Sequence, residues 1–271
     1  MFELISMKKL PPWEWPENSE QILTGVLRDA SADTSDRLLA AELAGELPAS
    51  MDELADALLS IVQSGDEPGE LRAMAAIALG PTLENTYLSD FDDPYDETIT
   101  EGMFTRVNES LHKLYMDSTV PEEVRRRILE GSVRAPQEWH RDAVRAAYAS
   151  GKDNWRLTAV FCMRYVKGFE DQVLEALQDE DPDMLYEAVC AAGNWHLDAA
   201  WPRLTALLAS EETDRDVLFA VIEAVTDIRP REAGVVLVDL ADSEDEEITE
   251  AATEAMVLAE DYPDDFDLDD E

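Results

Sequence analysis

Basic residues are scarce in this 271-residue sequence. Lysine and arginine together number 21, of which five are lysine, against 62 aspartates and glutamates, and the formal net charge is −41. A surface this negative repels DNA, RNA and anionic membranes over most of its area. We therefore expect no direct nucleic-acid partner and no membrane partner. The acidity is consistent with either adaptation to a salty cytoplasm or a basic binding partner.

Cysteine is nearly absent, and the two residues present do not make a disulfide framework. Cys162 and Cys190 follow Asp153 and Asp181, respectively, by nine residues. This shared spacing places the two cysteines at equivalent points of neighbouring structural units. We predict that both are small core residues. A redox or metal-binding pair is the alternative.

Long apolar runs are also missing. The N-terminal residues MFELISMKKLPPWEW lack the continuous apolar segment of a secretory signal peptide. No stretch approaches the roughly 20 apolar residues that span a membrane. A reduced cytoplasm is therefore the expected location. Hydrophobic residues nevertheless make up 45% of the chain, which is enough for a continuous core.

Two similar segments, DRLLAAELAG at 36–45 and ELRAMAAIALG at 70–80, are offset by 35 residues. The offset aligns Arg37 with Arg72, Ala40 and Ala41 with Ala75 and Ala76, and Gly45 with Gly80. A helix with a face of small residues that recurs at this period is typical of a unit that stacks on copies of itself. We expect Ala76 to lie at a close contact between two such helices.

The pattern resembles the second helix of a HEAT-like repeat, of the kind also found in phycobilisome lyases. The resemblance covers roughly residues 20–260 and implies an all-α fold: a right-handed α-solenoid of about seven antiparallel helix pairs, in a bacterial protein. Apolar residues recur at helical spacing, as at Leu54, Leu58 and Ile61, and no segment alternates like a strand for more than a few residues. Proteins of this architecture mostly bind other proteins.

Three parts are expected along the chain. Residues 1–18 are a lead-in, where the prolines of PPWEWP oppose a helix and Trp13 and Trp15 cover the apolar end of the first repeat. Residues 19–260 form the solenoid. Residues 261–271 form an acidic tail that is expected to be mobile.

Local signals predict interruptions and helix ends within the solenoid. Gly80 and Pro81 are expected to end a helix, and residues 85–102 to form an insertion loop. The aspartates of this loop lack the glycine and terminal glutamate of a calcium-binding hand, so a solvated acidic loop is preferred to a cation site. Three aspartates are expected to cap inner helices: Asp153, Asp181 and Asp214.

Catalytic features are scarce. The three histidines, His112, His140 and His196, have no second histidine or cysteine at ligand spacing. Deoxyhypusine hydroxylase, a HEAT-repeat enzyme, binds iron through His-Glu dipeptides, and none occurs here. There is no phosphate-binding glycine loop and no GxSxG, and serine, histidine and aspartate are only scattered. We therefore predict no catalytic residue, no metal, no cofactor and no enzymatic activity.

Basic residues concentrate in one segment. Residues 120–167 hold 10 basic and 6 acidic residues, whereas both flanking segments are strongly negative. Aromatic residues are interleaved with them, and arginine and tryptophan are the residues that most often anchor interfaces. We predict a basic–aromatic patch that binds an acidic partner segment, made of Arg126, Arg127, Arg141, Arg145, Trp139, Trp155 and Arg156.

A structural role is the alternative for these arginines. Arg37 and Arg72 belong to the repeat pattern, where the arginine supports packing between repeats, and arginines of residues 120–167 can do the same or neutralise acidic neighbours. The arginines expected to be exposed are Arg126, Arg127, Arg141 and Arg145. The last two are four residues apart and so share one helical face.

Three functions remain open. The leading hypothesis is a non-enzymatic scaffold or adaptor that binds a protein or peptide on its curved surface. The alternative is an acidic antagonist that imitates nucleic acid or neutralises a basic protein, as an immunity protein does. A ligand-handling protein similar to bilin lyases is the third hypothesis.

Overall fold

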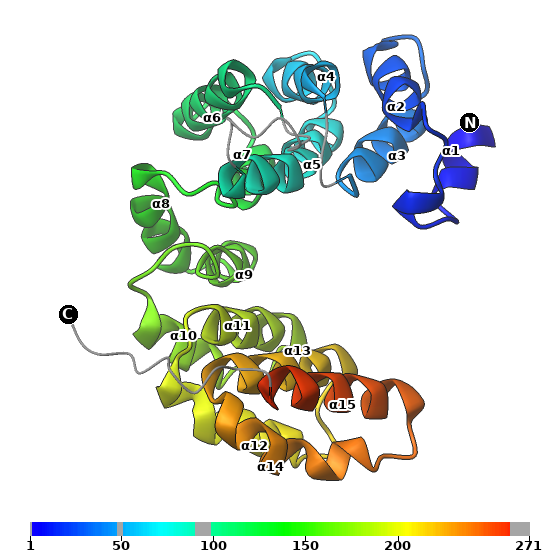
Figure 1. Ribbon diagram of the computed structural model, residues 1–271. Helices are drawn as coiled ribbons and strands as arrows, with labels where there is room; N and C mark the ends of the chain where they lie inside the picture. The colour runs from blue at the N-terminus through cyan, green and yellow to red at the C-terminus, as the bar shows by residue number, and fades with distance from the viewer. Residues whose placement is uncertain (1, 48–50, 90–98, 261–271) are drawn as a thin grey trace. The chain divides into compact units, whose positions relative to one another are not determined.

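The computed structural model describes residues 2–47, 51–89 and 99–260 (Figure 1). Every regular element in these ranges is a helix, and they contain no strand, which confirms the all-α prediction. None of these helices is long and apolar enough to cross a membrane. The predicted acidic tail, and residues 90–98 of the predicted insertion loop with its aspartates, lie outside the described residues.

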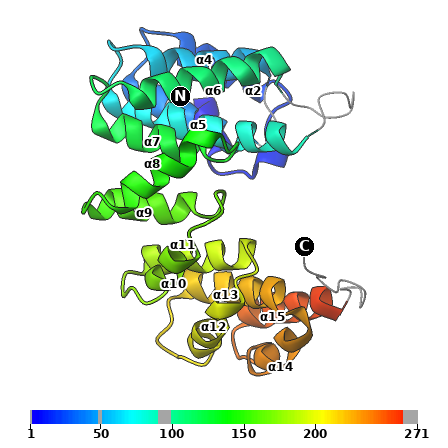
Figure 2. The ribbon, with the colours of Figure 1, turned by 90° about the vertical axis from the view of Figure 1, so that its left-hand side faces the viewer.

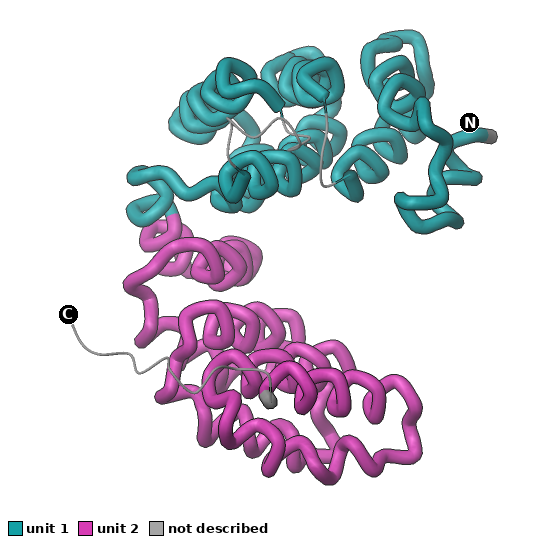
Figure 3. Tube along the Cα trace, in the orientation of Figure 1, with its two compact units in different colours: residues 1–143 teal, residues 144–271 magenta. Residues whose placement is uncertain are grey.

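Two compact units divide the chain, residues 1–143 and 144–271 (Figure 3). The first unit contains α1 (Phe2–Met7), η1 (Pro12–Glu14), α2 (Ser19–Arg28), α3 (Thr34–Ala44), α4 (Asp52–Gln63), α5 (Gly69–Leu88), α6 (Glu101–Met116) and α7 (Glu122–Ser132). Helix α8 (Glu138–Tyr148) begins in the first unit and ends in the second. The second unit continues with α9 (Asp153–Cys162), α10 (Glu170–Ala176), α11 (Pro182–Asn194), η2 (Asp198–Ala200), α12 (Trp201–Leu208), α13 (Arg215–Ile228), α14 (Pro230–Ala241) and α15 (Glu246–Glu260).

Both units consist of successive helix pairs. In the first unit α2 packs on α3, α4 on α5 and α6 on α7; in the second, α10 packs on α11, α12 on α13 and α14 on α15. Within each unit, the second helices of successive pairs also pack on each other: α3 on α5 and α5 on α7 in the first, and α9 on α11, α11 on α13 and α13 on α15 in the second, where Figure 2 shows α11, α13 and α15. We call these second helices (α3, α5, α7, α9, α11, α13 and α15) the inner helices. Helices α8 and α9 follow each other in the chain between the third and the fourth pair, so the described residues contain fourteen helices, α2 to α15, in the order that about seven pairs require.

Glycines allow neighbouring inner helices to approach closely. A Cβ built on Gly45, at the end of α3, would lie 3.2 Å from the Cα atom of Ala78 in α5, and one built on Gly193 of α11 would lie 3.2 Å from the Cα atom of Ala224 in α13. Gly80 has a similar role against α7, because a Cβ there would lie 2.8 Å from Cδ of Arg134. The glycine that recurs in the sequence is therefore a packing residue.

The prediction that Gly80 and Pro81 end a helix is wrong. Helix α5 continues through Pro81 to Leu88 and takes up the first part of the predicted insertion loop. Proline removes one backbone hydrogen bond from a helix. The residues that follow are buried, however: Thr82, Leu83 and Thr86 are at most 3% exposed. Burial of this last turn favours the helix despite the proline.

The repeated arginine has a structural role, but the hydrogen bond common to Arg37 and Arg72 lies within one repeat, whereas packing between repeats was predicted. Nε of Arg37 donates a hydrogen bond to the backbone oxygen of Leu27 at 3.3 Å, and Nε of Arg72 donates one to that of Val62 at 3.0 Å. Each acceptor lies ten residues earlier, near the end of the preceding helix, where carbonyl groups lack helical partners. Both guanidinium groups are buried. The arginine thus fixes the two helices of one repeat to each other.

The lead-in is more helical than expected. Helix α1 was not predicted, and Pro12 begins the short helix η1 at a position that tolerates proline. Trp15 is buried, and its Nε1 donates to the carbonyl oxygens of Met7 and Leu10, both at 2.9 Å. Trp13 is 84% exposed, so its predicted role in covering the first repeat is wrong.

Helix caps and cysteines follow the predictions in part. Asp181 and Asp214 accept hydrogen bonds from backbone N–H groups at the starts of α11 and α13, as expected. Asp153 lies inside the first turn of α9 after Lys152, so it does not cap that helix. Both cysteines are free thiols; Cys162 is buried in the core, whereas Cys190 is only half-buried.

Candidate functional site

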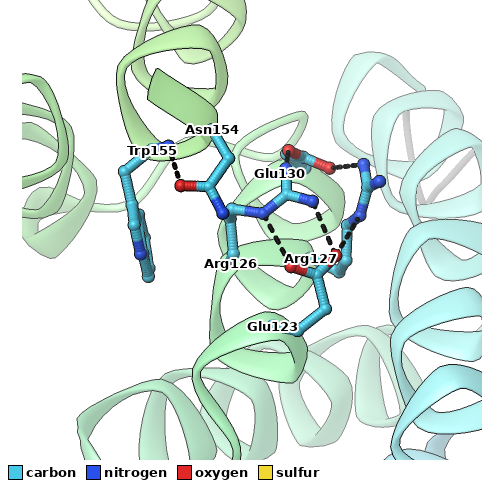
Figure 4. A network of polar contacts seen from close by, with 6 residues as sticks. All are labelled: Glu123, Arg126, Arg127, Glu130, Asn154 and Trp155. Atoms are coloured by element: carbon cyan, nitrogen blue, oxygen red, sulfur yellow. Dashed lines mark hydrogen bonds and ion pairs between the residues drawn. The ribbon is translucent and has the colours of Figure 1, made fainter. Parts of the chain in front are cut away.

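The residues of the predicted basic–aromatic patch are divided between the two units. In α7, Arg126 and Arg127 share two carboxylates (Figure 4). Arg126 donates to Glu123 at 2.6 and 3.0 Å and to Glu130 at 2.7 Å. Arg127 donates to Glu123 at 3.1 Å and to Glu130 at 2.5 Å. The four charges form a network with no net charge.

Burial and pKa values agree with this pairing. Arg126 is only 7% exposed, so the prediction that it is exposed is wrong. Hydrogen bonding from Arg126 lowers the pKa of Glu123 below its usual value. Burial alone would lower the pKa of Arg127, but the attraction of Glu130 and Glu123 outweighs it and the pKa is raised. The structural alternative therefore describes these two arginines better than the patch does.

Other arginines of residues 120–167 also have internal partners. Arg134 pairs with Glu84 of α5 at 2.6 Å. In the second unit, Arg164 pairs with Glu187 of α11 at 3.2 Å. These pairs connect neighbouring inner helices, as the structural alternative predicts.

The second-unit members Arg156 and Trp155 are also engaged. Arg156 pairs with Asp179 at 2.8 Å and lies 5.4 Å from the centre of the Tyr148 ring. Trp155 is buried, and its backbone N–H donates to Oδ1 of Asn154 (Figure 4). Arg156 is thus already paired and Trp155 is buried, whereas the prediction requires both side chains to be accessible to an acidic partner segment.

Arg141 and Arg145 differ from the other predicted residues because both side chains are exposed, as predicted. They lie four residues apart in the continuous helix α8, so they occupy one face of it. Binding of an acidic segment by these two arginines stays a prediction.

Trp139 lies in a stack of rings within the first unit. Its centroid is 4.7 Å from that of His112 with nearly parallel planes, 5.0 Å from that of Tyr115 and 3.8 Å from that of His140. His112 and Tyr115 come from α6, so the stack holds α6 against the first turn of α8. Trp139 is half-buried, so part of its side chain is exposed.

Ser132 and His140, eight residues apart in the sequence, form a hydrogen bond in the core. Nε2 of His140 lies 3.0 Å from Oγ of Ser132. Nδ1 of His140 accepts from the backbone N–H of Gln137 at 2.8 Å, so the ring proton is on Nε2 and points to the serine. Ser132 in turn donates to the carbonyl oxygen of Ile128 at 2.7 Å.

This arrangement runs opposite to that of a catalytic serine, whose hydroxyl donates to the histidine. Both side chains are at most 1% exposed, and burial lowers the pKa of His140 to about 3. The imidazole is therefore neutral at physiological pH and acts as a structural hydrogen-bond bridge.

His196 also has a structural partner. Its backbone lies in the left-handed region with φ of 47°, which is uncommon outside glycine. Nδ1 lies 2.8 Å from the backbone oxygen of Asp227, so Nδ1 carries the proton. Within the described ranges, no group of three or more histidine, cysteine, aspartate or glutamate residues is arranged to hold a metal ion.

A groove that was not predicted from the sequence lies between the inner helices α11 and α13. It has a volume of about 460 Å³. Residues from the first two turns of α11 and from the corresponding part of α13 line it: Pro182, Asp183, Tyr186, Asp214, Asp216, Phe219, Ala220 and Glu223. Tyr186 and Phe219 are half-buried, whereas the carboxylates are exposed.

The carboxylates of this groove are not neutralised locally. Asp183, Asp216 and Glu223 form no ion pair with any base in the part of the chain that the structure describes. The basic residues nearby have other partners: Arg215 binds Asp245 and Glu247, both at 2.6 Å. The groove is therefore a negatively charged surface with two aromatic rings.

A sequence signal for this groove does exist. Residues 181–186 read DPDMLY and residues 214–219 read DRDVLF, so the same pattern recurs after 33 positions. Capping explains the first aspartate of each segment. The second aspartate and the aromatic residue have no such explanation, and their recurrence at one face of consecutive inner helices could have indicated the groove.

Comparison with known families supports the repeat assignment. Residues 170–257 match the family described as HEAT repeats. This segment contains α10 to α14 and most of α15, and therefore the groove. No curated protein matches the chain significantly.

Solved structures with similar helix arrangements are distant in sequence. Human deoxyhypusine hydroxylase in complex with glycerol is 19% identical, with 95% of this chain and 88% of that chain covered and a TM-score of 0.41. Kap121p is 13% identical over 95% of this chain and 31% of its own, with a TM-score of 0.44. An engineered protein is 17% identical, with 89% of this chain and 78% of that chain covered and a TM-score of 0.40.

Proposed function

We propose that this protein is a non-enzymatic scaffold that binds a protein or peptide partner along its inner helices. The observation that supports this most directly is the groove between α11 and α13, because two successive repeats contribute side chains to one hollow. Solenoids present extended surfaces of this kind, to which neighbouring repeats contribute jointly. The proposal requires no reacting group, only a surface shaped by stacked helices.

A second surface of the same scaffold is the exposed pair Arg141 and Arg145 on α8. Guanidinium groups bind carboxylates in bidentate fashion, so this pair suits the acidic partner segment predicted from the sequence. The other arginines of the predicted patch, Arg126, Arg127 and Arg156, form ion pairs that support the fold. The phycobilisome-lyase type of repeat, the bacterial origin and the cytoplasmic location stay predictions.

The acidic antagonist is the second candidate. The carboxylates of the groove favour it, because Asp183, Asp216 and Glu223 are exposed and form no ion pair within the described residues. Such a protein binds a basic target mainly through long-range attraction, which salt screens. A scaffold that holds its partner in a groove with aromatic rings also relies on apolar contacts, which salt does not weaken. The salt dependence of binding therefore separates the two candidates.

Affinity capture tests the proposal. The full chain is immobilised, exposed to an extract of the source cell and washed at low and at high ionic strength, and retained proteins are identified by mass spectrometry. A scaffold is expected to retain a defined partner at both salt concentrations. Retention of many basic proteins at low salt only would support the antagonist instead, and the absence of any specific partner would contradict both.

A further inference from the structure

The groove between α11 and α13 combines two chemical features that point to one class of ligand. Its rim carries Asp183, Asp216 and Glu223, which are exposed and form no ion pair within the described parts of the chain. Its wall carries the rings of Tyr186 and Phe219. Carboxylates attract a cation, and an aromatic face binds a cation and its aliphatic stem. Lysine and arginine side chains satisfy both features at once.

An arginine of the protein itself contacts one of these two rings. The guanidinium group of Arg215 lies 5.2 Å from the centre of the Phe219 ring. The same group binds the carboxylates of Asp245 and Glu247. An arginine that contacts an aromatic ring and carboxylates together is thus already present at the edge of the groove, and Tyr186, one repeat earlier, is the equivalent ring in α11.

The size of the groove favours a peptide over a small ion. A volume of about 460 Å³ lies within the range of pockets that hold drug-sized ligands, which is far more than one ion occupies. The lining residues follow two adjacent inner helices, so an extended segment can contact both repeats. A nucleic acid is disfavoured, because its phosphates would meet the unpaired carboxylates.

We propose that the groove between α11 and α13 binds an extended peptide segment of a partner protein that carries arginine or lysine. The proposal rests on the scaffold function and specifies its partner. One basic side chain lies against Tyr186 with its charge at Asp183 or Glu223, and a neighbouring basic side chain reaches Asp216. Charge complementarity gives selectivity for basic segments, and the rings hold the aliphatic stems.

The test uses a short fluorescent peptide of alternating arginine and alanine, with the full chain and fluorescence anisotropy as the readout. The variant Asp183→Asn/Glu223→Gln removes two groove carboxylates. The control Asp239→Asn/Glu250→Gln removes two exposed carboxylates from α14 and α15, outside the groove. We expect the groove variant to bind at least about tenfold more weakly and the control to change by less than about twofold.

A further variant, Tyr186→Ala, tests the aromatic contribution. It is expected to weaken binding about fivefold at high salt, where screening leaves the ring contact dominant. Circular dichroism and thermal unfolding establish that each variant is folded. Equal losses in the groove variant and the charge-matched control would show diffuse attraction to an acidic protein and overturn the proposal, as would no binding by the wild type.

The cellular partner separates this proposal from the scaffold function. Partners captured by the wild type are compared with those captured by Asp183→Asn/Glu223→Gln. Loss of a partner whose binding segment is basic supports the groove. Retention of every partner refutes the groove and leaves the scaffold function intact, whereas a wild type that captures no specific partner refutes the scaffold function itself.

Discussion

A Cβ built on Gly131 of α7 would lie 2.1 Å from the backbone carbonyl oxygen of Ala76 in α5. Real Cβ atoms do not approach a backbone oxygen this closely, so only glycine allows the two inner helices their present separation. Ala76 itself is fully buried, which confirms the prediction that it lies at a close helix contact. Its contact partner, Gly131, lies 55 residues later in the sequence, and the repeat pattern did not predict this contact.

Gly131→Ala is therefore expected to destabilise the protein by at least about 2 kcal/mol, because the overlap is with backbone and not with a flexible side chain. Urea unfolding followed by circular dichroism measures the change. The matched control is Gly25→Ala in α2, where a built Cβ meets nothing within 4 Å. Alanine should leave stability unchanged there or raise it by up to about 1 kcal/mol. Similar effects at both sites would contradict the close contact.

His140 is expected to make stability depend on pH. Burial lowers its folded pKa to about 3, whereas an unfolded histidine titrates near pH 6.5. Between these values the unfolded state binds the extra proton, so stability falls as the pH falls, by about 1.4 kcal/mol per unit from this residue. The full contribution is present above about pH 6.5.

The measurement compares the free energy of unfolding of the wild type and His140→Gln from about pH 7.5 to 5, above the range where carboxylates titrate. The variant should be less stable at neutral pH, because the Ser132 bridge is lost, and its stability should change less with pH. Parallel pH profiles for the two proteins would show that His140 does not stay neutral in the folded state.

Replacing tryptophan by phenylalanine can be compared at a buried position, Trp15, and at an exposed one, Trp13. Trp15→Phe removes the Nε1–H that binds the Met7 and Leu10 carbonyl oxygens and leaves a smaller ring in the core. A loss of about 2–3 kcal/mol is expected from the unsatisfied acceptors and the reduced packing. Trp13→Phe, at an 84% exposed position, should change stability by less than about 0.5 kcal/mol. Thermal unfolding of both variants checks the contrast, and equal losses would be inconsistent with it.

The double variant Arg141→Glu/Arg145→Glu tests the remaining part of the predicted acidic-partner patch. If the pair binds a partner, the variant should fold normally and lose that partner in affinity capture. If the arginines are structural, it should lose stability instead, by up to about 1 kcal/mol for each exposed ion pair that is broken. The control Lys9→Glu/Lys113→Glu makes the same charge change at two exposed residues outside 120–167. A folded double variant that keeps every partner would eliminate this surface.

Part of the arginine pairing could have been derived from the sequence. Glu123, Arg126, Arg127 and Glu130 are three or four residues apart in one predicted helix, which is the spacing of side chains that meet on a helical face. Summing charge over residues 120–167 obscured this, because the sum ignores which charges face one another. The prediction that Arg126 is exposed was therefore wrong, although the spacing of these four residues in the sequence already indicated its pairing.

The sequence by itself determined most of the helices, their repetition at a period near 35 residues, the structural character of Arg37 and Arg72, and the caps at Asp181 and Asp214. Helix faces, caps and the arginine contacts depend on groups within about ten residues of each other, where helical geometry fixes which side chains meet. Only the tertiary structure decided which distant groups came together. The Gly131–Ala76 contact, the Arg134–Glu84 pair and the groove of Tyr186 and Phe219 all require the packing of separate inner helices. Residue order specifies local chemistry, whereas the depth and register with which two helices pack depend on the shapes of both surfaces at once.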